Sequence, residues 1–362
     1  MKRAALCILL LCAAAAVAGV RWTIAWRVRT GGEILAAPLV TDSTVYCTSQ
    51  DEYVYALSVK TGKRPWATKL GAPLDTTPVL HGKRLWVATS DNRLVCIEAA
   101  TGKRLWQHQA TDSFGSAPLI LPATKTTPAR VLASCYDANL YCLSLEGKLL
   151  WTATAGDRIN GQPALCGETV VFGCCDGKVY FVRLSDGKTL GSVDMEDYLP
   201  AGPVVEGTTL YIATAGHTVA KLDATTRKPL WTAKPTKAEE KKLGSLFATP
   251  ALVGKRLILG DDTGHLRCLS ATNGKLLWSV RLRGGIHAPP TLVGIDLLVT
   301  TDQGRVYAIN PVDGKTLWSY RLGGGKLTSV VPAKDRLLVG SASGWLYCIE
   351  PKVAPNPKGP RP

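Results

Sequence analysis

An internal repeat with a period of about 40 residues constrains the fold of this 362-residue chain more than any other feature. Proline recurs once per unit, and tryptophan recurs in step with it. The prolines are Pro38, Pro78, Pro118, Pro163, Pro203, Pro250 and Pro290. The tryptophans are Trp26, Trp66, Trp106, Trp151, Trp231, Trp278 and Trp318, and Gly191 occupies the one missing position. Insertions at about 121–130 and about 234–246 account for the two longer intervals.

Each unit contains four short apolar runs separated by turn residues. In the first unit these runs are Ala37–Val40, Thr44–Thr48, Tyr53–Leu57 and a segment that carries Trp66. The runs are rich in Val, Tyr, Ile and Leu, and Gly, Asp and Asn interrupt them, which is typical of strands joined by tight turns. Four-stranded units of this length are the blades of β-propellers.

The number of tryptophan positions gives the number of blades. Seven complete units lie between Trp26 and Trp318, and residues 319–350 supply three further strands. The segment Arg21–Trp26 supplies a fourth strand without a unit of its own. We therefore predict an all-β fold, an eight-bladed β-propeller of four-stranded antiparallel blades over residues 19–350. Its last blade is closed by the N-terminal strand, which removes the open edges.

The N-terminal residues resemble an export signal. Lys2 and Arg3 precede an apolar stretch over residues 4–17, and the small residues at 16 and 18 fit a cleavage site after Ala18. We expect residues 1–18 to be a signal peptide and the protein to be exported to the periplasm or the cell exterior. An uncleaved membrane anchor remains the alternative.

Two further features concern the ends of the chain. Leu11 precedes Cys12, whereas a lipoprotein signal needs a small residue there, so we do not expect lipidation. The segment 351–362 contains five prolines, and we expect a disordered, extended tail.

Most of the cysteines are expected to be core residues rather than partners in disulfides. Eleven cysteines are present, and nine remain after the signal, an odd number that cannot all pair. Four of them share one position with Ala56 and Ala308: Cys96, Cys142, Cys268 and Cys348. The adjacent pair Cys174-Cys175 could form a strained disulfide, but it lies at an ordinary turn between strands.

The repeat carries a recognisable signature, Ala-x5-Gly-x3-Trp. It stands as Ala56…Gly62…Trp66 and Ala308…Gly314…Trp318, with Cys in the first position at Cys96…Gly102…Trp106 and Cys268…Gly274…Trp278. Blade 3 has a shorter version and blades 4 and 5 depart from it. The chain resembles the PQQ-like repeat (quinoprotein-type) propellers and is similar to the propeller scaffold of the bacterial outer-membrane β-barrel assembly machinery. The resemblance implies that each tryptophan docks against the neighbouring blade and that the protein is a non-catalytic, protein-binding scaffold of the cell envelope.

A quinone-dependent oxidoreductase is the first alternative. Propellers of that class bind pyrroloquinoline quinone and Ca²⁺ with long loops, whereas the connections here are short. The turn acids Asp51, Asp91, Asp137 and Asp176 occur one per blade, which suits turns better than a Ca²⁺ site. No nucleophile or phosphate-binding motif is present, so we expect no cofactor and no catalysis. An extracytoplasmic sensor or ligand-binding module is the second alternative. A polar central pocket with converging charges would favour cofactor binding, whereas a plugged opening would favour a scaffold.

Three histidines are expected at one end of the ring. His217 and His265 lie in second-to-third-strand turns of neighbouring blades, and His287 enters the next blade at the same end. They are weak candidates for a metal or ligand site. The simpler interpretation is that they are solvent-exposed turn residues.

Charge is expected to be polarised between the two ends. The net charge is +15, and the third-to-fourth-strand turns carry one lysine each. These are Lys63, Lys103, Lys148, Lys188, Lys228, Lys275 and Lys315, a ring that suits anionic lipids or glycans. The opposite end carries the turn acids and the insertion near 234–246. We expect this insertion to bind envelope proteins through Lys237, Glu239, Glu240, Lys241 and Lys242. We expect a monomer that does not bind nucleic acid, since no base-reading element accompanies the charge.

Overall fold

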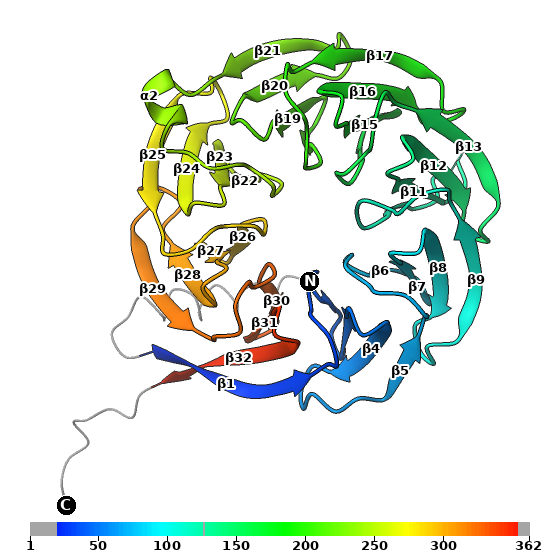
Figure 1. The fold of residues 1–362 in the computed structure, drawn as a ribbon, viewed down its shortest axis with the longest axis vertical. Helices are drawn as coiled ribbons and strands as arrows, with labels where there is room; N and C mark the ends of the chain where they lie inside the picture. Colours follow the sequence, from blue (N-terminus) through cyan, green and yellow to red (C-terminus); the bar gives the residue numbers. More distant parts are fainter. Residues whose placement is uncertain (1–19, 126, 354–362) are drawn as a thin grey trace, which may run out of the picture.

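The chain folds into a ring of four-stranded antiparallel sheets around a central opening (Figure 1). The computed structural model describes residues 20–125 and 127–353. Its eight sheets confirm the predicted eight-bladed β-propeller, and the N-terminal strand completes the last sheet as predicted. No helix among the described residues is both long and apolar enough to cross a membrane.

The first four blades follow one another along the chain. Blade 1 contains β2 (Leu39–Val40), β3 (Thr44–Thr48), β4 (Tyr53–Ser58) and β5 (Trp66–Lys69). Blade 2 contains β6 (Val79–His81), β7 (Arg84–Ala88), β8 (Arg93–Glu98) and β9 (Arg104–Gln109). Blade 3 contains β10 (Leu119–Leu121), β11 (Arg130–Ser134), β12 (Asn139–Ser144) and β13 (Leu149–Thr154). Blade 4 contains β14 (Ala164–Cys166), β15 (Thr169–Gly173), β16 (Lys178–Arg183) and β17 (Thr189–Asp194).

The remaining blades continue this order and return to the N-terminus. Blade 5 contains β18 (Val204–Glu206), β19 (Thr209–Ala213), β20 (Val219–Asp223) and β21 (Lys228–Ala233), and α2 (Lys237–Glu240) follows it. Blade 6 contains β22 (Ala251–Val253), β23 (Arg256–Gly260), β24 (His265–Ser270) and β25 (Leu276–Arg281). Blade 7 contains β26 (Thr291–Val293), β27 (Asp296–Thr300), β28 (Arg305–Ile309) and β29 (Thr316–Arg321). Blade 8 contains β30 (Val331–Ala333), β31 (Arg336–Gly340), β32 (Trp345–Val353) and β1 (Val20–Arg29).

Strands β1 and β32 close the ring at the lower left of Figure 1. Their ladder pairs Val20 with Val353 at one end and Arg29 with Trp345 at the other. Strand β32 thus continues three residues past the predicted boundary at 350, because β1 is long enough to pair with these residues as well. The rest of the predicted tail, like the predicted signal peptide, lies outside the described residues.

Neighbouring blades are held together by tryptophans whose indole rings lie flat on a glycine of the next blade. At the closing seam a Cβ on Gly62, whose φ is +68°, would lie 2.8 Å from the ring of Trp26, so only glycine fits there. The indole Nε1 of Trp26 donates a hydrogen bond of 2.9 Å to the carbonyl oxygen of Val59 in the same turn. The same contact recurs between Trp66 and Gly102, Trp106 and Gly147, Trp151 and Gly187, Trp231 and Gly274, and Trp278 and Gly314.

An arginine reinforces three of these seams. It begins the second strand of its blade and donates to the same carbonyl oxygen that accepts the indole N–H. The pairs of donors on one acceptor are Trp26 and Arg336 on Val59, Trp106 and Arg84 on Leu145, and Trp151 and Arg130 on Leu184. Hydrogen bonds from a charged donor are stronger than neutral ones, so these seams hold a fixed register between neighbouring blades.

In five of the complete repeats a β-bulge precedes the tryptophan and turns one leucine outward, whereas the ladder of blade 1 has no register shift before Trp66. In blade 2, Cys96 pairs with Trp106 and Ile97 pairs with Arg104, so Leu105 has no partner across the ladder. Blades 3, 5, 6 and 7 repeat this arrangement. The bulge aims the tryptophan at the next blade and leaves the leucine exposed on the outer rim.

The seam between blades 4 and 5 lacks a tryptophan, and a different set of residues fills it. Gly191 pairs with Phe181, whereas all other blades except blade 5 place an alanine or a cysteine opposite a tryptophan. The fully buried Phe181 ring thus supplies apolar volume in a row that lacks the indole. Across the seam Arg227 stands where the repeat has glycine, with φ +56°, and its side chain reaches within 3.3 Å of a Cβ placed on Gly191.

The seam between blades 7 and 8 also differs, because blade 8 has no third-to-fourth-strand turn. Trp318 therefore finds no glycine there and instead contacts Trp22 of β1, with ring centroids 5.2 Å apart. This contact explains why the closing strand carries a second tryptophan four residues before Trp26.

The closing contact yields a prediction for stability. Replacing Trp26 by alanine should lower the free energy of unfolding by about 3–5 kcal/mol, since a large ring packed between two blades is lost. Ile24→Ala on the same strand is the control, because Ile24 is 38% exposed, and its cost should stay below about 1 kcal/mol. Denaturant unfolding measures both values. Equal costs would show that the seam does not depend on the indole.

The irregular seam yields a prediction of non-additivity. Gly191→Trp alone should cost about 1–3 kcal/mol, because Phe181 and Arg227 occupy the space and Gly191 has a φ of +153°. The pair Phe181→Cys and Arg227→Gly alone should cost about 3 kcal/mol through the volume that it removes. All three changes together rebuild the common seam and should be more stable than the sum of these losses by at least about 2 kcal/mol. Strictly additive losses in denaturant unfolding would contradict this account.

Candidate functional site

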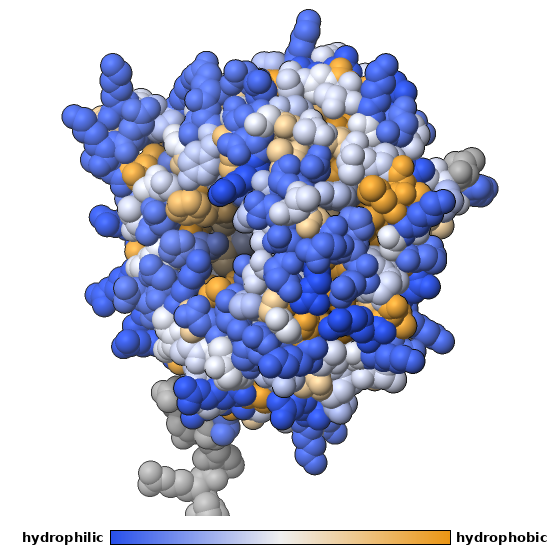
Figure 2. All heavy atoms as spheres, turned by 45° about the vertical axis from the view of Figure 1, so that its right-hand side comes forward, coloured by the Kyte–Doolittle hydropathy of each residue, from blue (hydrophilic) through white to orange (hydrophobic). Residues whose placement is uncertain are grey.

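The two ends of the ring differ in the connections that they carry. Second-to-third-strand turns and fourth-to-first-strand connections emerge at one end, which we call the acidic face. First-to-second-strand and third-to-fourth-strand turns emerge at the other end, which we call the lysine face. Hydrophilic side chains cover most of the surface visible in Figure 2, and apolar residues form small separate patches.

Many turn acids of the acidic face are engaged in internal hydrogen bonds. Asp51 accepts hydrogen bonds from the hydroxyl of Tyr55 in its own blade and from the amide of Gly31 in the preceding connection, both at 2.6 Å. Asp137 and Asp176 accept the same 2.6 Å bond from Tyr141 and Tyr180. These carboxylates therefore tie each turn to its surroundings, in agreement with the turn chemistry expected from their spacing.

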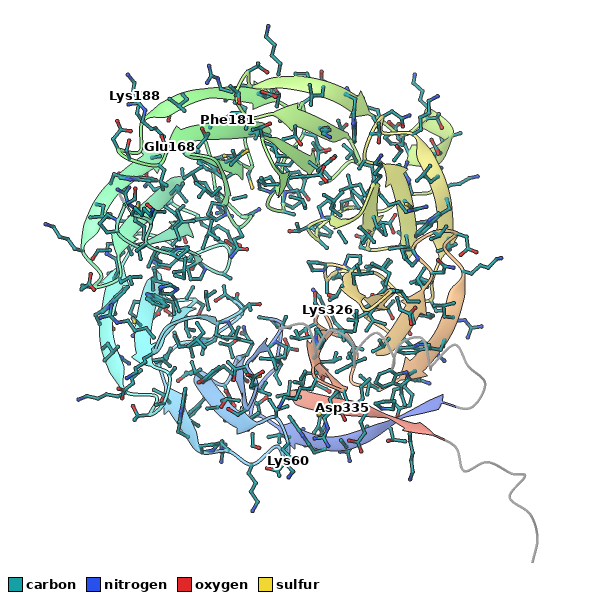
Figure 3. All side chains as sticks on the ribbon, turned by 180° about the vertical axis from the view of Figure 1, so that it is seen from behind. Lys60, Glu168, Phe181, Lys188, Lys326 and Asp335 are labelled. Atoms are coloured by element: carbon teal, nitrogen blue, oxygen red, sulfur yellow. The ribbon has the colours of Figure 1, made fainter. Side chains whose placement is uncertain are left out.

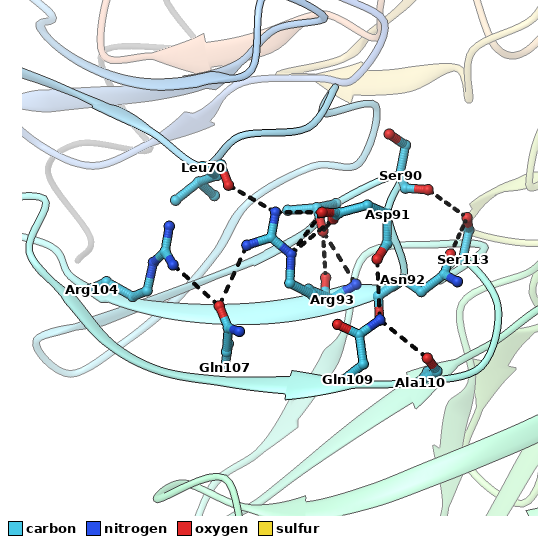
Figure 4. A network of polar contacts seen from close by, with 11 residues as sticks. Leu70, Ser90, Asp91, Asn92, Arg93, Arg104, Gln107, Gln109, Ala110 and Ser113 are labelled. Atoms are coloured by element: carbon cyan, nitrogen blue, oxygen red, sulfur yellow. Dashed lines mark hydrogen bonds and ion pairs between the residues drawn. The ribbon is translucent and has the colours of Figure 1, made fainter.

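Blade 2 replaces the tyrosine with an arginine network, shown in Figure 4. Arg93 forms an ion pair of 2.6 Å with Asp91 and donates a 2.8 Å hydrogen bond to the carbonyl oxygen of Leu70 in blade 1. Ser113, from the connection into blade 3, donates to the carbonyl oxygen of Ser90 and to Asn92. The network fixes the connections on both sides of blade 2.

The central opening forms a cavity of about 470 Å³ lined by every blade. The lining comes from the residues that precede each first strand, and it consists mainly of Gly, Ala, Ser, Thr and Pro. Its titratable side chains are Asp75 on blade 2, His287 on blade 7 and Lys326 on blade 8. Desolvation by the surrounding wall raises the pKa of the Asp75 carboxyl. The opening is thus neither plugged nor lined by converging charges.

This lining does not fit pyrroloquinoline quinone. The quinone is a planar tricarboxylate, which needs several cationic or hydrogen-bond-donating groups around its edge. Lys326 and His287 lie on neighbouring blades, but Asp75 presents a carboxylate to the same cavity and would repel the ligand. In the described part of the chain, no group of three or more His, Cys, Asp or Glu side chains could hold a metal ion.

Two of the three candidate histidines meet around one buried carboxylate, and the third lies elsewhere. Asp261 is fully buried, and its Oδ2 lies 3.7 Å from Nε2 of His217 and 3.5 Å from Nδ1 of His265. His287 instead approaches Asp302 at 3.6 Å and stacks on Phe247 at the channel. His217 is 4% exposed, so the expectation of a solvent-exposed turn residue was wrong for it. The insertion after blade 5 covers this turn.

His217 holds that insertion in place as a neutral imidazole. Its Nε2 lies 3.0 Å from the carbonyl oxygen of Gly244, and because a carbonyl only accepts, Nε2 carries the proton. Nδ1 then accepts from the guanidinium of Arg267 at 3.4 Å. Burial and the charge of Arg267 both lower the pKa of His217.

Backbone hydrogen bonds complete the anchorage of the insertion. The amides of Gly244 and Ser245 donate to the carboxylates of Asp261 and Asp262, at 3.1 and 2.8 Å. The amide of Leu246 donates to the carbonyl oxygen of Ala215 at 3.0 Å. The insertion is thus a defined element of blades 5 and 6.

The five charged residues of the insertion divide into two groups. Glu239 caps α2 by accepting hydrogen bonds of 2.8 Å from the amide and the hydroxyl of Thr236, so it serves the fold of the insertion. Lys237, Glu240, Lys241 and Lys242 are exposed. These four side chains are the ones available to a partner.

Sequence reasoning missed Asp261 and Arg267, although the repeat contains a signal for both. Asp261 stands where the other blades have Ser, Thr or Cys, and Arg267 stands at the position of Tyr55, Tyr141 and Tyr180. Two charged residues in positions that are neutral in most other blades mark the place where the insertion docks.

The seven lysines of the third-to-fourth-strand turns are all exposed. Figure 3 shows Lys60 and Lys188 at the outer rim, whereas Lys326 lies beside the central opening. Within the described chain, Lys315 is the one member of the seven in an ion pair, with Asp313 at 3.3 Å.

The cysteines are core residues, as expected. Of the nine described cysteines, all free, eight are buried and Cys175 is half-buried. Burial raises the pKa of the Cys96 thiol to about 12. Cys174 donates to the carbonyl oxygen of Asp157 at 3.1 Å, and Cys175 accepts from Asn160 at 3.0 Å, so each thiol of the adjacent pair has its own partner.

Comparison with known proteins identifies relatives. The family model described as outer membrane protein assembly factor BamB matches residues 16–171, 175–243 and 217–353. Curated relatives of that name include proteins from Legionella pneumophila, 26% identical over 186 residues, and Burkholderia pseudomallei, 25% identical over 267 residues. These alignments cover 47% and 71% of this chain, and 46% and 58% of the relatives. The chain thus aligns with about half the length of these relatives.

Solved structures share the fold. BamB from Moraxella catarrhalis superposes with a TM-score of 0.74 at 18% identity, covering 91% of this chain and 98% of that one. The computationally designed Ika8 protein superposes with a TM-score of 0.76 at 14% identity, covering 89% and 97%. A designed protein matches as well as a natural one, so fold similarity by itself assigns no function.

The environment of His217 yields a prediction for pH dependence. Because the folded state lowers the pKa of His217 below its ordinary 6.5, folding disfavours the proton. The anchorage is complete above pH 6.5 and weakens as the pH falls toward the folded pKa, where a proton on Nδ1 would face Arg267. Hydrogen exchange of the Ser245 and Leu246 amides, corrected for intrinsic rates, should accelerate between neutral and mildly acidic pH.

His217→Asn is the matched control, since asparagine tolerates the φ of +68° at this position and does not titrate. In this variant the Ser245 and Leu246 amides should exchange faster at neutral pH than in the unaltered protein, and their exchange should depend less on pH. Asp261, His265 and Glu239 also face the cluster around His217 and Arg267, and they remain in both proteins. An identical pH dependence in the two proteins would therefore assign the effect to these groups.

Proposed function

Because the chain belongs to the family of the outer membrane protein assembly factor BamB, we propose that it is a non-catalytic scaffold of the cell envelope that binds other envelope proteins. The observation that carries this proposal is the family match over most of the chain, on a complete closed ring. A rigid ring with short connections presents binding residues at fixed positions without rearranging.

The acidic face is the surface that we assign to protein partners. The insertion there is anchored by His217, Asp261 and Asp262, yet it exposes four charged side chains. Next to it, Phe247 and Tyr198 are 43% and 36% exposed. Exposed aromatic residues surrounded by charged ones are typical of protein interfaces.

The cellular setting follows from the N-terminal sequence. We propose that residues 1–18 direct export, with cleavage after Ala18, and that the ring functions in the periplasm or outside the cell as a monomer. The lysine face then offers a diffuse positive field to anionic envelope surfaces.

The proposal is tested by capture of partners from envelope extracts of the source organism. We expect that replacing the exposed Lys237, Glu240, Lys241 and Lys242 by serine lowers the recovery of specific partners at least about tenfold, because the charged side chains assigned to the partner are removed. A tenfold loss corresponds to about 1.4 kcal/mol of binding free energy. Anchorage of the insertion through Gly244 to Leu246 is untouched, so the melting temperature should not change.

The control carries the same number and kinds of charge on the lysine face: Lys60, Lys63, Lys228 and Glu146 replaced by serine. It should retain partner recovery. Partners must bind again when purified components are mixed, and mass spectrometry must identify them as envelope proteins. If both variants retain all partners, the acidic face is not the binding surface.

A further inference from the structure

Both ends of the described chain lie at the lysine face. Third strands run from the acidic face to the lysine face, and β32 is the third strand of blade 8. Strand β1 pairs with it antiparallel, with Val20 opposite Val353, so β1 begins where β32 ends. In complete blades the chain turns back at the position of Glu350, whereas here the ladder continues to Val353. The chain thus enters and leaves the ring at one face.

The segment before β1 is the most apolar of the sequence. Residues 4–17 contain no charged side chain and follow Lys2 and Arg3. In the sequence, this apolar segment, which we propose directs export, is separated from Val20 by only two residues. Until the proposed cleavage after Ala18, it is therefore joined to the end of β1 that lies at the lysine face.

The lysine face combines basic and apolar side chains in one repeating unit. Each regular third-to-fourth-strand turn places a lysine two residues before the leucine that the bulge turns outward. The pairs are Lys103 and Leu105, Lys148 and Leu150, Lys228 and Leu230, Lys275 and Leu277, and Lys315 and Leu317. Their leucines are 40–56% exposed, with Leu317 at 40% and Leu230 at 56%. Single exposed leucines are common on protein surfaces. A leucine that recurs beside a lysine in five turns around the rim is a pattern, and it indicates a binding surface.

We propose that the lysine face docks on an anionic lipid bilayer, with the axis of the ring along the bilayer normal. The lysines meet the lipid phosphates and the bulge leucines enter the headgroup region, as basic and apolar side chains do at membrane surfaces. A lipid surface rather than an anionic glycan is favoured because a polysaccharide offers no apolar phase to the leucines. The inference deepens the proposed function and rests on it, since the acidic face then points away from the membrane toward protein partners.

The first experiment measures binding of the purified ring to vesicles by flotation. With about 30% phosphatidylglycerol in phosphatidylcholine the protein should float with the vesicles at low salt, and with pure phosphatidylcholine it should not. Raising the salt to about 500 mM should release most of it. Equal binding to both vesicles, or to neither, would overturn the proposal.

The second experiment reads the orientation from lysine acylation. Vesicles should protect Lys103, Lys148 and Lys275 from an amine-reactive reagent severalfold, as counted by mass spectrometry. Lys237, Lys241 and Lys242 on the acidic face should react as they do without vesicles. Protection of the acidic-face lysines, or uniform protection, would contradict docking through the lysine face.

Two matched variants separate charge from position. Lys103, Lys148, Lys228 and Lys275 changed to glutamine should abolish flotation, while Lys237, Lys241, Lys242 and Lys326 changed to glutamine should keep it at the same net charge. All eight side chains are exposed, so neither variant should change the melting temperature. Equal loss in both would assign binding to net charge alone.

A leucine variant separates a bilayer from a soluble polyanion. Leu105, Leu230 and Leu277 changed to serine should weaken vesicle binding at moderate salt and leave retention on immobilised heparin unchanged. An unchanged flotation would overturn the lipid assignment in favour of a polyanionic glycan. If the unaltered protein captures its partners but does not float with anionic vesicles, this inference alone is rejected. If the unaltered protein floats but captures no envelope protein, the proposed function alone is rejected.

Discussion

The contact of a flat indole with a left-handed glycine turn holds this ring together. A single blade buries too little apolar surface to be stable, so each blade depends on its neighbours. The Trp26–Gly62 contact shows how specific the solution is: the ring fits only where a Cβ is absent, and its N–H satisfies a carbonyl in the same turn. The small residue opposite all of these tryptophans except Trp231 leaves room for the indole, and in most blades a bulge before the tryptophan sets its direction. These three features explain why alanine or cysteine, glycine and tryptophan recur together.

The same logic explains where the sequence was a reliable guide. The period of tryptophan and proline predicted the number of blades, the strand order and the closing role of β1, because these follow from repeated local contacts. The repeat shows that Gly191 stands at a tryptophan position, but it does not show which residues fill the seam in place of the indole. The volume of Phe181 and the side chain of Arg227 replace the indole from two different blades, and a repeat pattern read along the chain does not reveal that they meet.

The candidate site was less predictable for a related reason. The shared face of the three histidines followed from strand direction alone, and the structure places two of them near Asp261. Their burial did not follow, because it depends on how the insertion folds back over blades 5 and 6. Long-range contacts such as Arg267 with His217, 50 residues apart, arise from tertiary packing and leave no periodic trace. The charged residues of the insertion can be read from the sequence. The sequence does not show that Glu239 caps α2 while the other four side chains remain exposed.

The ladder between β1 and β32 has a mechanical consequence. Val20 and Val353 are paired at its outer end, so tension applied to the two ends of the chain acts on a single hydrogen-bonded pair at a time. In this geometry strands peel apart stepwise, and the whole ladder does not share the load as it would in shear. Each step also advances toward Trp22 and then Trp26, whose contacts to blades 7 and 1 resist further opening. A ring tethered by one end alone, with the other end free, never experiences this peeling force.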